Sequence, residues 1–344
     1  MRRSVRPGLV VVVTGASSGI GRATALAFAR RGARVVVGAR SPRVLERVAR
    51  ECRAAHPAAE AVAVPADVTD AEAVERLART ARARFGRIDV WVNAAGVGVL
   101  GRLSDVALAD VRRLWDVNVL GALHGARAAL PAMRDQGRGV VVDIASVLGG
   151  VVQAPYMGPY AASKAALVTL DEVLRQELAL AGAHGVHVCT VLPTGVDTPF
   201  FQHAANHTGR SMRALPSVAT PERVAATVRR AATRARPPRR VAVGPGARLL
   251  PAAHATLRGP TLRLIAWRTE RHYLGRQGSA GATRGRLWTP SGDSASVRGG
   301  RHAKARTAGR GLAMLGLAGA VAVVVGRAAT RTASSPPGTH PDHP

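Results

Sequence analysis

The sequence is poor in cysteine, in lysine and in aromatic residues. Its two cysteines, Cys52 and Cys189, stand among 344 residues and give neither a disulfide framework nor the spacing of a metal site. We therefore predict no bound metal and a reducing, cytoplasmic setting. Cys189 lies in the apolar run 186–191 and is expected to be a buried, unreactive thiol. Aromatic residues make up 3% of the chain and show no pattern for stacking on nucleic-acid bases.

Acidic residues are also few, 21 against 49 Lys plus Arg, and they are unevenly placed. Residues 1–200 carry 25 basic and 17 acidic residues, whereas the remaining 144 carry 24 basic and 4 acidic residues. A tail with this excess of positive charge could attract nucleic acid. Arginine-rich composition explains much of the charge, however, and no recognition motif accompanies it. We predict no specific nucleic-acid partner.

A glycine-rich turn follows the first apolar run. Residues 9–13 are Leu followed by four Val, a run typical of a buried parallel strand. The turn Thr14-Gly-Ala-Ser-Ser-Gly-Ile-Gly21 comes next, and residues 22–30 have helical character. In a dinucleotide-binding site, glycines at such a turn let the backbone approach a pyrophosphate, and the helix N-terminus offers free N–H groups. The spacing Gly-x-x-x-Gly-x-Gly differs from the commoner Gly-x-Gly-x-x-Gly.

Alternating strands and helices continue to about residue 243. Further strands are predicted at 34–38, 61–64, 88–92, 139–144, 186–191 and 240–243, with helices at about 42–55, 70–84, 108–133, up to 180 and from 221. Repeated βα units predict the α/β class, a doubly wound parallel sheet of the Rossmann type. Residues 1–245 would form its single catalytic domain, with a basic C-terminal extension. Ligands bind beyond the carboxyl ends of such strands.

Tyr160 and Lys164 stand four residues apart, on one face of a predicted helix. Lys164 is one of two lysines in the chain, with Lys304. The pKa of a lysine changes readily with its surroundings, unlike that of arginine. A neighbouring ammonium would lower the phenol pKa from about 10, which would make Tyr160 a proton donor near neutral pH. The alternative is a solvated lysine beside a core tyrosine.

Other motifs follow in a familiar order: Asp67-Val68, Asn93-Ala-Ala-Gly96, Asn118, Ser146, Tyr160-Ala-Ala-Ser-Lys164 and Pro193-Thr-Gly-Val-Asp-Thr198. With the glycine turn, they resemble the classical short-chain dehydrogenase/reductase family over about residues 7–245. The resemblance implies an oxidoreductase that transfers a hydride between a nicotinamide cofactor and a carbonyl or secondary-alcohol substrate, as a ketoreductase does. It also implies a homodimer or homotetramer.

The resemblance assigns catalytic roles to four residues. Tyr160 would be the general acid or base, and Ser146 would orient the carbonyl oxygen. Lys164 would lower the tyrosine pKa and hold the nicotinamide ribose, and Asn118 would hold a water that relays protons to solvent. The cofactor would contact Gly15, Ser17, Ser18, Gly19, Ile20, Gly21, Arg40, Asp67, Val68, Asn93, Ala94, Gly96, Tyr160, Lys164, Pro193, Gly195, Val196 and Thr198.

The choice of cofactor depends on the end of the second strand. An acidic residue there would accept from the ribose 2′-OH of NAD, whereas an arginine would bind the 2′-phosphate of NADP. Residues 38–43 contain no acid and include Arg40, which could pair with a phosphate in bidentate fashion. Arg22, in the first turn of the first helix, would add positive charge. NADP(H) is therefore favoured over NAD(H).

The sequence departs from the family pattern in two loops. Ser146 and Tyr160 are 14 positions apart, one more than the family pattern, and residues 149–156 are expected to absorb the extra residue. Tyr156 is a rival for the proton donor but is expected to lie in a loop and point toward substrate. In the family, residues 199–216 correspond to a lid, and their aromatic and polar residues here would suit an apolar ketone or alcohol with one polar feature. His203 and His207 have no third companion for a metal site.

The chain beyond residue 245 lies outside the resemblance. Residues 246–274 mix basic and apolar residues, which fits either a helix on a membrane surface or a helix packed on the catalytic domain. Residues 275–310 are predicted to be a flexible Arg- and Gly-rich linker. Residues 311–326 are uncharged and apolar but shorter than the roughly 20 residues that a spanning helix needs. Residues 327–344 are predicted to be disordered.

Two alternatives to a free enzyme follow from these features. The apolar segment could attach the protein to the cytoplasmic face of a membrane, because basic residues flank it. The chain could also be a cofactor-binding scaffold or membrane-tethered regulator without turnover. Such a scaffold would be expected to lack the tyrosine or the lysine, and both are present.

Overall fold

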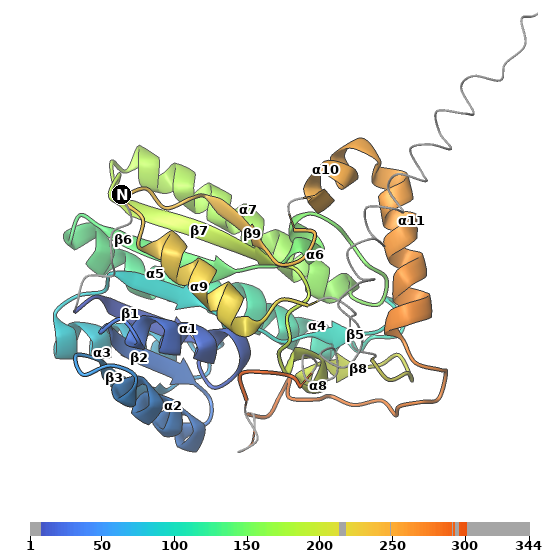
Figure 1. The fold of residues 1–344 in the computed structure, drawn as a ribbon, viewed down its shortest axis with the longest axis horizontal. Helices are drawn as coiled ribbons and strands as arrows, with labels where there is room; N and C mark the ends of the chain where they lie inside the picture. The colour runs from blue at the N-terminus through green and yellow to red at the C-terminus, as the bar shows by residue number, and fades with distance from the viewer. Residues whose placement is uncertain (1–7, 213–217, 248, 291, 293–295, 301–344) are drawn as a thin grey trace, which may run out of the picture. The chain divides into compact units, whose positions relative to one another are not determined.

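The computed structural model describes residues 8–212, 218–247, 249–290, 292 and 296–300. A parallel sheet of seven strands runs through them in the order β3-β2-β1-β4-β6-β7-β9 (Figure 1). The strands are β1 (Val10–Thr14), β2 (Arg34–Ala39), β3 (Glu60–Pro65), β4 (Val90–Asn93), β6 (Gly139–Ile144), β7 (Val186–Pro193) and β9 (Arg240–Val243). The direction of strand addition reverses between β1 and β4, and α/β proteins commonly bind ligands beyond the carboxyl ends of strands at such a point.

Helices cover both faces of the sheet, which explains why its central strands are apolar throughout. One face carries α1 (Gly19–Ala29), α2 (Pro42–Ala54) and α9 (Pro221–Ala232), and α3 (Ala71–Phe85) and α5 (Gly121–Asp135) pack on the other (Figure 1). Val10 to Val13 are all fully buried, with alternate side chains in the two core clusters. Burying each such side chain contributes about 1.5–3 kcal/mol.

The predicted α/β doubly wound fold is confirmed. Asp70 caps α3, because its carboxylate accepts from the backbone N–H groups of Glu72 and Ala73. The predicted helix 108–133 is in fact three segments: α4 (Leu108–Trp115), the π-helical turn η1 (Asp116–Leu120) and α5. The π turn contains Asn118, and such turns are frequent at functional sites.

Several short elements near the strand ends were not predicted. Strand β5 (Val99–Leu100) pairs with β8 (Ala205–Asn206) in a small second sheet. Helices α6 (Val147–Gly150) and α8 (Phe200–His203) flank the helix that carries Tyr160, α7 (Gly158–Leu180). These elements are too short to leave a periodic pattern in the sequence.

The C-terminal extension contains α10 (Leu249–Thr256), α11 (Arg258–Arg268) and the π-helical turn η2 (Thr269–Tyr273). Neither α10 nor α11 has a buried residue. Residues 275–300, predicted to be part of a flexible linker, make specific contacts with the catalytic domain where the structure describes them. The predicted apolar helix 311–326 and the tail 327–344 lie outside the described residues. Among the described helices, none has both the length and the apolar character to cross a bilayer.

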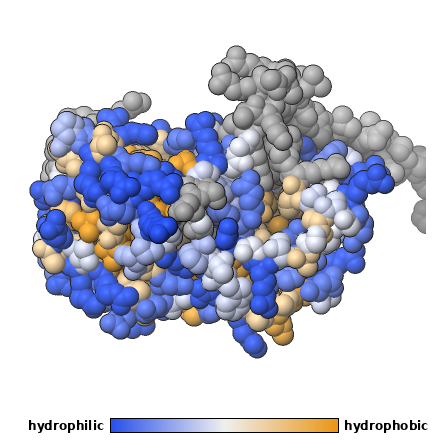
Figure 2. All heavy atoms as spheres, turned by 90° about the horizontal axis from the view of Figure 1, so that it is seen from below, coloured by the Kyte–Doolittle hydropathy of each residue, from blue (hydrophilic) through white to orange (hydrophobic). Residues whose placement is uncertain are grey.

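The surface of the described residues is largely hydrophilic where it can be seen. Figure 2 shows one face on which hydrophilic residues predominate and hydrophobic residues form small, separate areas. The larger exposed apolar side chains on α4, α5 and α7 include Leu108, Leu123, Leu170 and Val173.

Candidate active site

The glycine turn after β1 has the shape that its sequence predicts. Gly15 has φ +64° and Gly19 has φ +51°, a region that side chains other than glycine rarely adopt. A Cβ on Gly15 would lie 2.6 Å from the Ala95 backbone, and one on Gly21 would lie 2.3 Å from the Gly15 oxygen. Thr198 closes the other side of this turn, because its Cγ2 lies 3.3 Å from the position of a Cβ on Gly19. The turn and residues 193–198, predicted to share a cofactor, are therefore adjacent.

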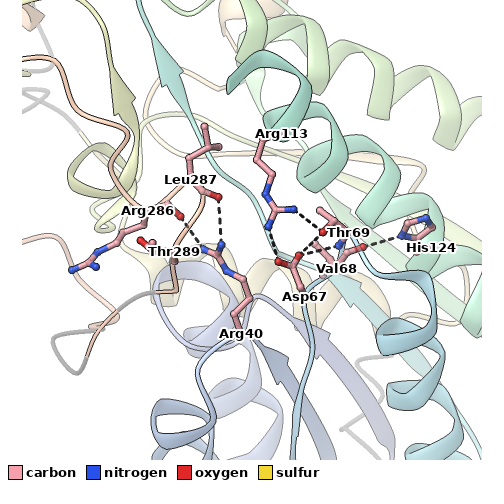
Figure 3. A network of polar contacts seen from close by, with 9 residues as sticks. All are labelled: Arg40, Asp67, Val68, Thr69, Arg113, His124, Arg286, Leu287 and Thr289. Atoms are coloured by element: carbon pink, nitrogen blue, oxygen red, sulfur yellow. Dashed lines mark hydrogen bonds and ion pairs between the residues drawn. The ribbon is translucent and has the colours of Figure 1, made fainter. Parts of the chain in front are cut away.

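Arg40 and Asp67 lie at the carboxyl ends of β2 and β3, as predicted, but both are engaged by other parts of the chain (Figure 3). The Arg40 guanidinium donates to three backbone oxygens of the extension, those of Arg286, Leu287 and Thr289. Asp67 pairs with Arg113 of α4 at 2.6 Å. Although burial raises the pKa of Asp67, the net effect of hydrogen bonds from Thr69 and Arg113 is to lower it.

Arg22 and Asn93 are also bound within the protein. Arg22 pairs with Glu51 of α2 at 2.6 Å, and this pair neutralises part of the charge expected to attract a phosphate. The buried Asn93 amide donates to the Ala122 oxygen and, at 2.7 Å, to Asp143. Its oxygen accepts from the Trp91 indole. In this structure Asn93 connects strands β4 and β6.

Ser146, Tyr160 and Lys164 meet where β6 ends and α7 begins. Ser146 acts to lower the pKa of the Tyr160 phenol, and the Lys164 Nζ lies 5.8 Å from the centroid of the Tyr160 ring. Lys164 is 4% exposed and donates to the Ile144 oxygen at 2.7 Å. The loop between Ser146 and Tyr160 contains one glycine with a positive φ. Gly149 takes φ +89° where a Cβ would collide with the Ala161 oxygen.

The expected direction of the Tyr160 pKa is wrong for this geometry. Burial raises the pKa of Tyr160 to about 12, and the hydrogen bond from Ser146 offsets part of this rise. Burial also lowers the pKa of Lys164 to about 8, against the charges of Asp143 and Asp171. The sequence showed the helical spacing of the phenol and the ammonium, but not their depth of burial. The phenol is consequently protonated at neutral pH.

Asn118 lies beside this group, in the π-helical turn. Its side chain accepts from the Val97 N–H at 2.9 Å and donates to the Val97 oxygen and to the Ser163 hydroxyl. Gly96 separates Asn118 from Lys164: a Cβ there would lie 3.5 Å from the Asn118 oxygen and 3.7 Å from the Lys164 nitrogen. Asn118 and Lys164 are therefore neighbours, as the resemblance implied.

Two buried carboxyl groups near Lys164 were not singled out in the sequence. Asp143 of β6 and Asp171 of α7 are 3% and 2% exposed and share a hydrogen bond. Burial and the charge of Asp171 raise the pKa of Asp143; burial also raises the pKa of Asp171. Two carboxyl groups can share a hydrogen bond only if one holds a proton. A signal was available, because Asp171 lies seven residues after Lys164, two turns along the same helix face.

The substrate side of Tyr160 is apolar. Its ring packs against Phe200 with centroids 5.1 Å apart, and Leu148, Met157, Phe201 and Met212 belong to the same cluster. Tyr156 does lie in a loop, with φ +66°. Its hydroxyl donates to Glu270 of the extension at 2.7 Å. The extension therefore packs on the domain at this point, one of the two interpretations left open for residues 246–274.

The two cysteines are buried, and His207 is paired with a carboxylate. Cys52 and Cys189 are fully buried, and burial raises the pKa of each thiol to about 12. His207 faces Asp110 at 3.0 Å. Within the part of the chain that the structure describes, no group of three or more His, Cys, Asp or Glu side chains could hold a metal ion.

Comparisons with known proteins identify the family of the chain. The short chain dehydrogenase family matches residues 9–209. An uncharacterized oxidoreductase of Bacillus subtilis (strain 168), YxnA, is 38% identical over 202 residues, which cover 58% of this chain and 55% of that protein. The chain thus matches little more than half the length of this relative.

Two solved structures share the fold. An alcohol dehydrogenase from Thermococcus sibiricus, complexed with 5-hydroxy-NADP, has a TM-score of 0.59 and 28% identity, over 69% of this chain and 96% of that one. A short-chain dehydrogenase/reductase from Burkholderia phymatum, in complex with NAD, has a TM-score of 0.54 and 37% identity, over 56% of this chain and 68% of that one. The chain belongs to the short-chain dehydrogenase family.

Proposed function

We propose that the protein is an NADP(H)-dependent oxidoreductase that interconverts a ketone and a secondary alcohol, with Tyr160 as the proton-transferring residue. The observation that carries this proposal is the cluster of Ser146, Tyr160 and Lys164. Ser146 acts to lower the pKa of the Tyr160 phenol, and the Lys164 ammonium lies 5.8 Å from its ring. The cluster stands at the carboxyl edge of the sheet, where α/β proteins bind ligands.

The residues present fit a dinucleotide. Gly15 and Gly21 let the turn fold tightly on neighbouring backbone, because a Cβ on either would collide with Ala95 or with the Gly15 oxygen. Gly19 begins α1, whose N-terminus would favour a phosphate. Thr198 borders the same turn. Ser17, Ser18, Ile20, Val68, Ala94, Gly96, Pro193, Gly195 and Val196 remain the other proposed contacts.

In the proposed reaction, the cofactor and the protein side chains have different roles. A bound nicotinamide cofactor would supply or accept the hydride. In the reducing direction, the Ser146 hydroxyl would donate to the substrate carbonyl oxygen and orient it. The Tyr160 phenol, which is protonated at neutral pH, would give its proton to the oxygen as negative charge develops there. Lys164 would hold the ribose, and Asn118 would place a water for return of the proton from solvent.

The preference for NADP(H) is supported by the end of β2. Residues 38–43 contain no carboxylate, and Arg40 stands where a 2′-phosphate would bind. One solved relative was complexed with an NADP derivative and another with NAD, so this preference is a proposal about this chain's own residues.

Apolar side chains around Tyr160 and on the surface support proposals about the substrate and the assembly of the protein. The apolar cluster around Tyr160 would favour an apolar ketone or alcohol. We also propose a cytoplasmic protein that forms a homodimer or homotetramer through the exposed apolar side chains of α4, α5 and α7. Light scattering of the purified protein would test the oligomer. Attachment of the tail to a membrane remains a proposal about residues outside the described ones.

The decisive test is an assay of the full chain against a panel of apolar ketones and alcohols with NADPH and with NADH. We expect turnover with NADPH and a lower kcat/KM with NADH. Substitution Arg40→Ser should reduce the preference for NADPH by roughly tenfold to a hundredfold, because one charge-assisted bidentate contact is lost. Absence of turnover, with cofactor bound, would favour the scaffold alternative.

A further inference from the structure

A segment of the C-terminal extension contacts the groups proposed to bind the cofactor phosphates. We call its described residues, 284–290, 292 and 296–300, the C-terminal strap. The Gly19 N–H, at the start of α1, donates to the Ser296 oxygen at 3.0 Å. The Arg40 Nη2 donates to the Arg286 and Thr289 oxygens, each at 2.8 Å (Figure 3). Both contacts place main-chain oxygens against phosphate-binding donors.

The Gly19 N–H and the Arg40 guanidinium cannot make these hydrogen bonds to the strap and to a dinucleotide phosphate at the same time. A helix N-terminal N–H and a guanidinium bind phosphate oxygens because both carry positive charge toward the ligand. A backbone carbonyl oxygen satisfies the same donors, since it carries a partial negative charge. The Gly19 N–H is a single donor, and its direction is fixed by the turn. While it is bonded to Ser296, its position is closed to a pyrophosphate oxygen.

The strap is also anchored outside the nucleotide site. Leu287 is fully buried in a cluster with Val99, Leu114 and Ala205. The neighbouring Trp288 donates from its indole to Asp110 at 2.8 Å. These contacts fix the part of the strap that faces Arg40.

Its other part has anchors of its own. The Gly299 N–H donates to the Asp197 oxygen at 3.1 Å, beside Thr198. Arg298 pairs with Glu222 of α9 at 3.0 Å. The strap is thus held on both sides of its contact with Gly19.

We propose that the C-terminal strap is an internal ligand of the dinucleotide site, which NADP(H) must displace in order to bind. The inference rests on the proposed function. The strap and the cofactor would compete for the same donors. The apparent affinity for cofactor then equals the intrinsic affinity multiplied by the fraction of molecules whose strap is released. Cofactor binding therefore frees the C-terminal strap, and any partner that held the released strap would raise the affinity for cofactor.

Hydrogen–deuterium exchange of the full chain tests the direction of this coupling. With saturating NADPH, we expect the amides of Arg286, Leu287 and Gly299, which are bonded in the structure, to exchange several-fold faster. Amides of the glycine turn should exchange more slowly. Slower exchange in the strap would mean that it closes over the bound cofactor, and the inference would be wrong while cofactor binding stood.

A variant of the anchors tests the size of the effect. Trp288 and Arg298 are partly exposed, so Trp288→Ala/Arg298→Ala should fold. It removes the Trp288–Asp110 hydrogen bond and the Arg298–Glu222 ion pair, together with the contact of the Trp288 ring with Arg113, the partner of Asp67. We expect the Kd for NADPH, measured by calorimetry, to fall by roughly fivefold or more. The control is Trp267→Ala/Arg263→Ala in α11, which should leave the Kd unchanged.

The outcomes separate the two proposals. An unchanged or weaker Kd in the strap variant, with the native chain binding NADPH, would overturn the strap inference alone. Failure of the native chain and of both variants to bind NADPH or NADH would overturn the proposed cofactor and the inference with it. Binding by the strap variant only would support both.

Discussion

The catalytic end and the nucleotide end of the candidate site are held together in different ways. At the catalytic end, Lys164 and Asp143 are buried within the sheet and α7, and their partners belong to the same domain core. At the nucleotide end, Gly19 and Arg40 are bonded to the extension. The first arrangement is part of the fold itself, whereas the second uses contacts that a ligand could replace. This difference indicates that the groups at the catalytic end are held in place before any ligand binds. Access of a cofactor to the nucleotide end, in contrast, can change when the extension moves.

The largest expected effect is at the catalytic end. Tyr160→Phe removes the proton donor and should lower kcat/KM by about 10²–10⁴-fold, the usual contribution of general acid catalysis. The matched control is Tyr156→Phe, which removes only a hydroxyl bonded to Glu270 and should change kcat/KM less than about threefold. Normal turnover by Tyr160→Phe would contradict the assigned mechanism.

Removal of one buried carboxyl group should have the next largest effect, on the free energy of unfolding. Asp143→Ala leaves the Asn93 amide and Asp171 without their partner. It should lower the free energy of unfolding by about 2–4 kcal/mol, the cost of unsatisfied buried polar groups. Urea unfolding measures this. Asp105→Ala, at an exposed position, is the control and should change stability by less than about 0.5 kcal/mol. Equal effects would mean that the catalytic end is not a preorganised core.

The same carboxyl pair should give stability a particular pH dependence. The folded-state pKa of each group is raised. Its contribution to stability is therefore present below the unfolded pKa of about 4 and is lost as pH rises through the folded pKa. The double variant Asp143→Asn/Asp171→Asn removes this titration. Native stability, measured relative to the variant by urea unfolding, should fall from pH 4 toward pH 7 by on the order of 1 kcal/mol or more. Parallel curves would contradict a shared proton.

The smallest effect concerns the core on which both ends are built. Cys52 and Cys189 are fully buried, with the pKa of each thiol raised to about 12. A thiol-reactive disulfide reagent at pH 8 should label neither in the native protein and both in denaturant, because the thiolate is the reacting form. Addition of NADPH should not change this result. Labelling on cofactor binding would show that release of the strap loosens the core as well.

The fold could be predicted from the sequence because its strands are long and apolar. Four valines after Leu9, the glycine turn and Asp70 each act locally, and the structure shows a buried strand, a turn and a helix cap at these positions. The helix with Asn118 was predicted as continuous, since a π turn changes one hydrogen-bonding step and leaves little trace in the spacing of apolar residues.

The site could be predicted only in part, because some of its features depend on local sequence and others depend on contacts between distant segments. The spacing of Tyr160 and Lys164 is a local property, and the structure places them together. The pKa direction of Tyr160 was wrong because burial depends on contacts across the fold. The strap could not be predicted, because its composition is that of a linker. Its contacts with Gly19 and Arg40 join positions more than 240 residues apart.

The near absence of lysine has a practical consequence. Lys164 is buried and bonded to the Ile144 oxygen, and the only other lysine is Lys304. Reagents that acylate amines should therefore react poorly with Lys164. Amine-directed labelling would then leave the proposed ribose-binding nitrogen unmodified.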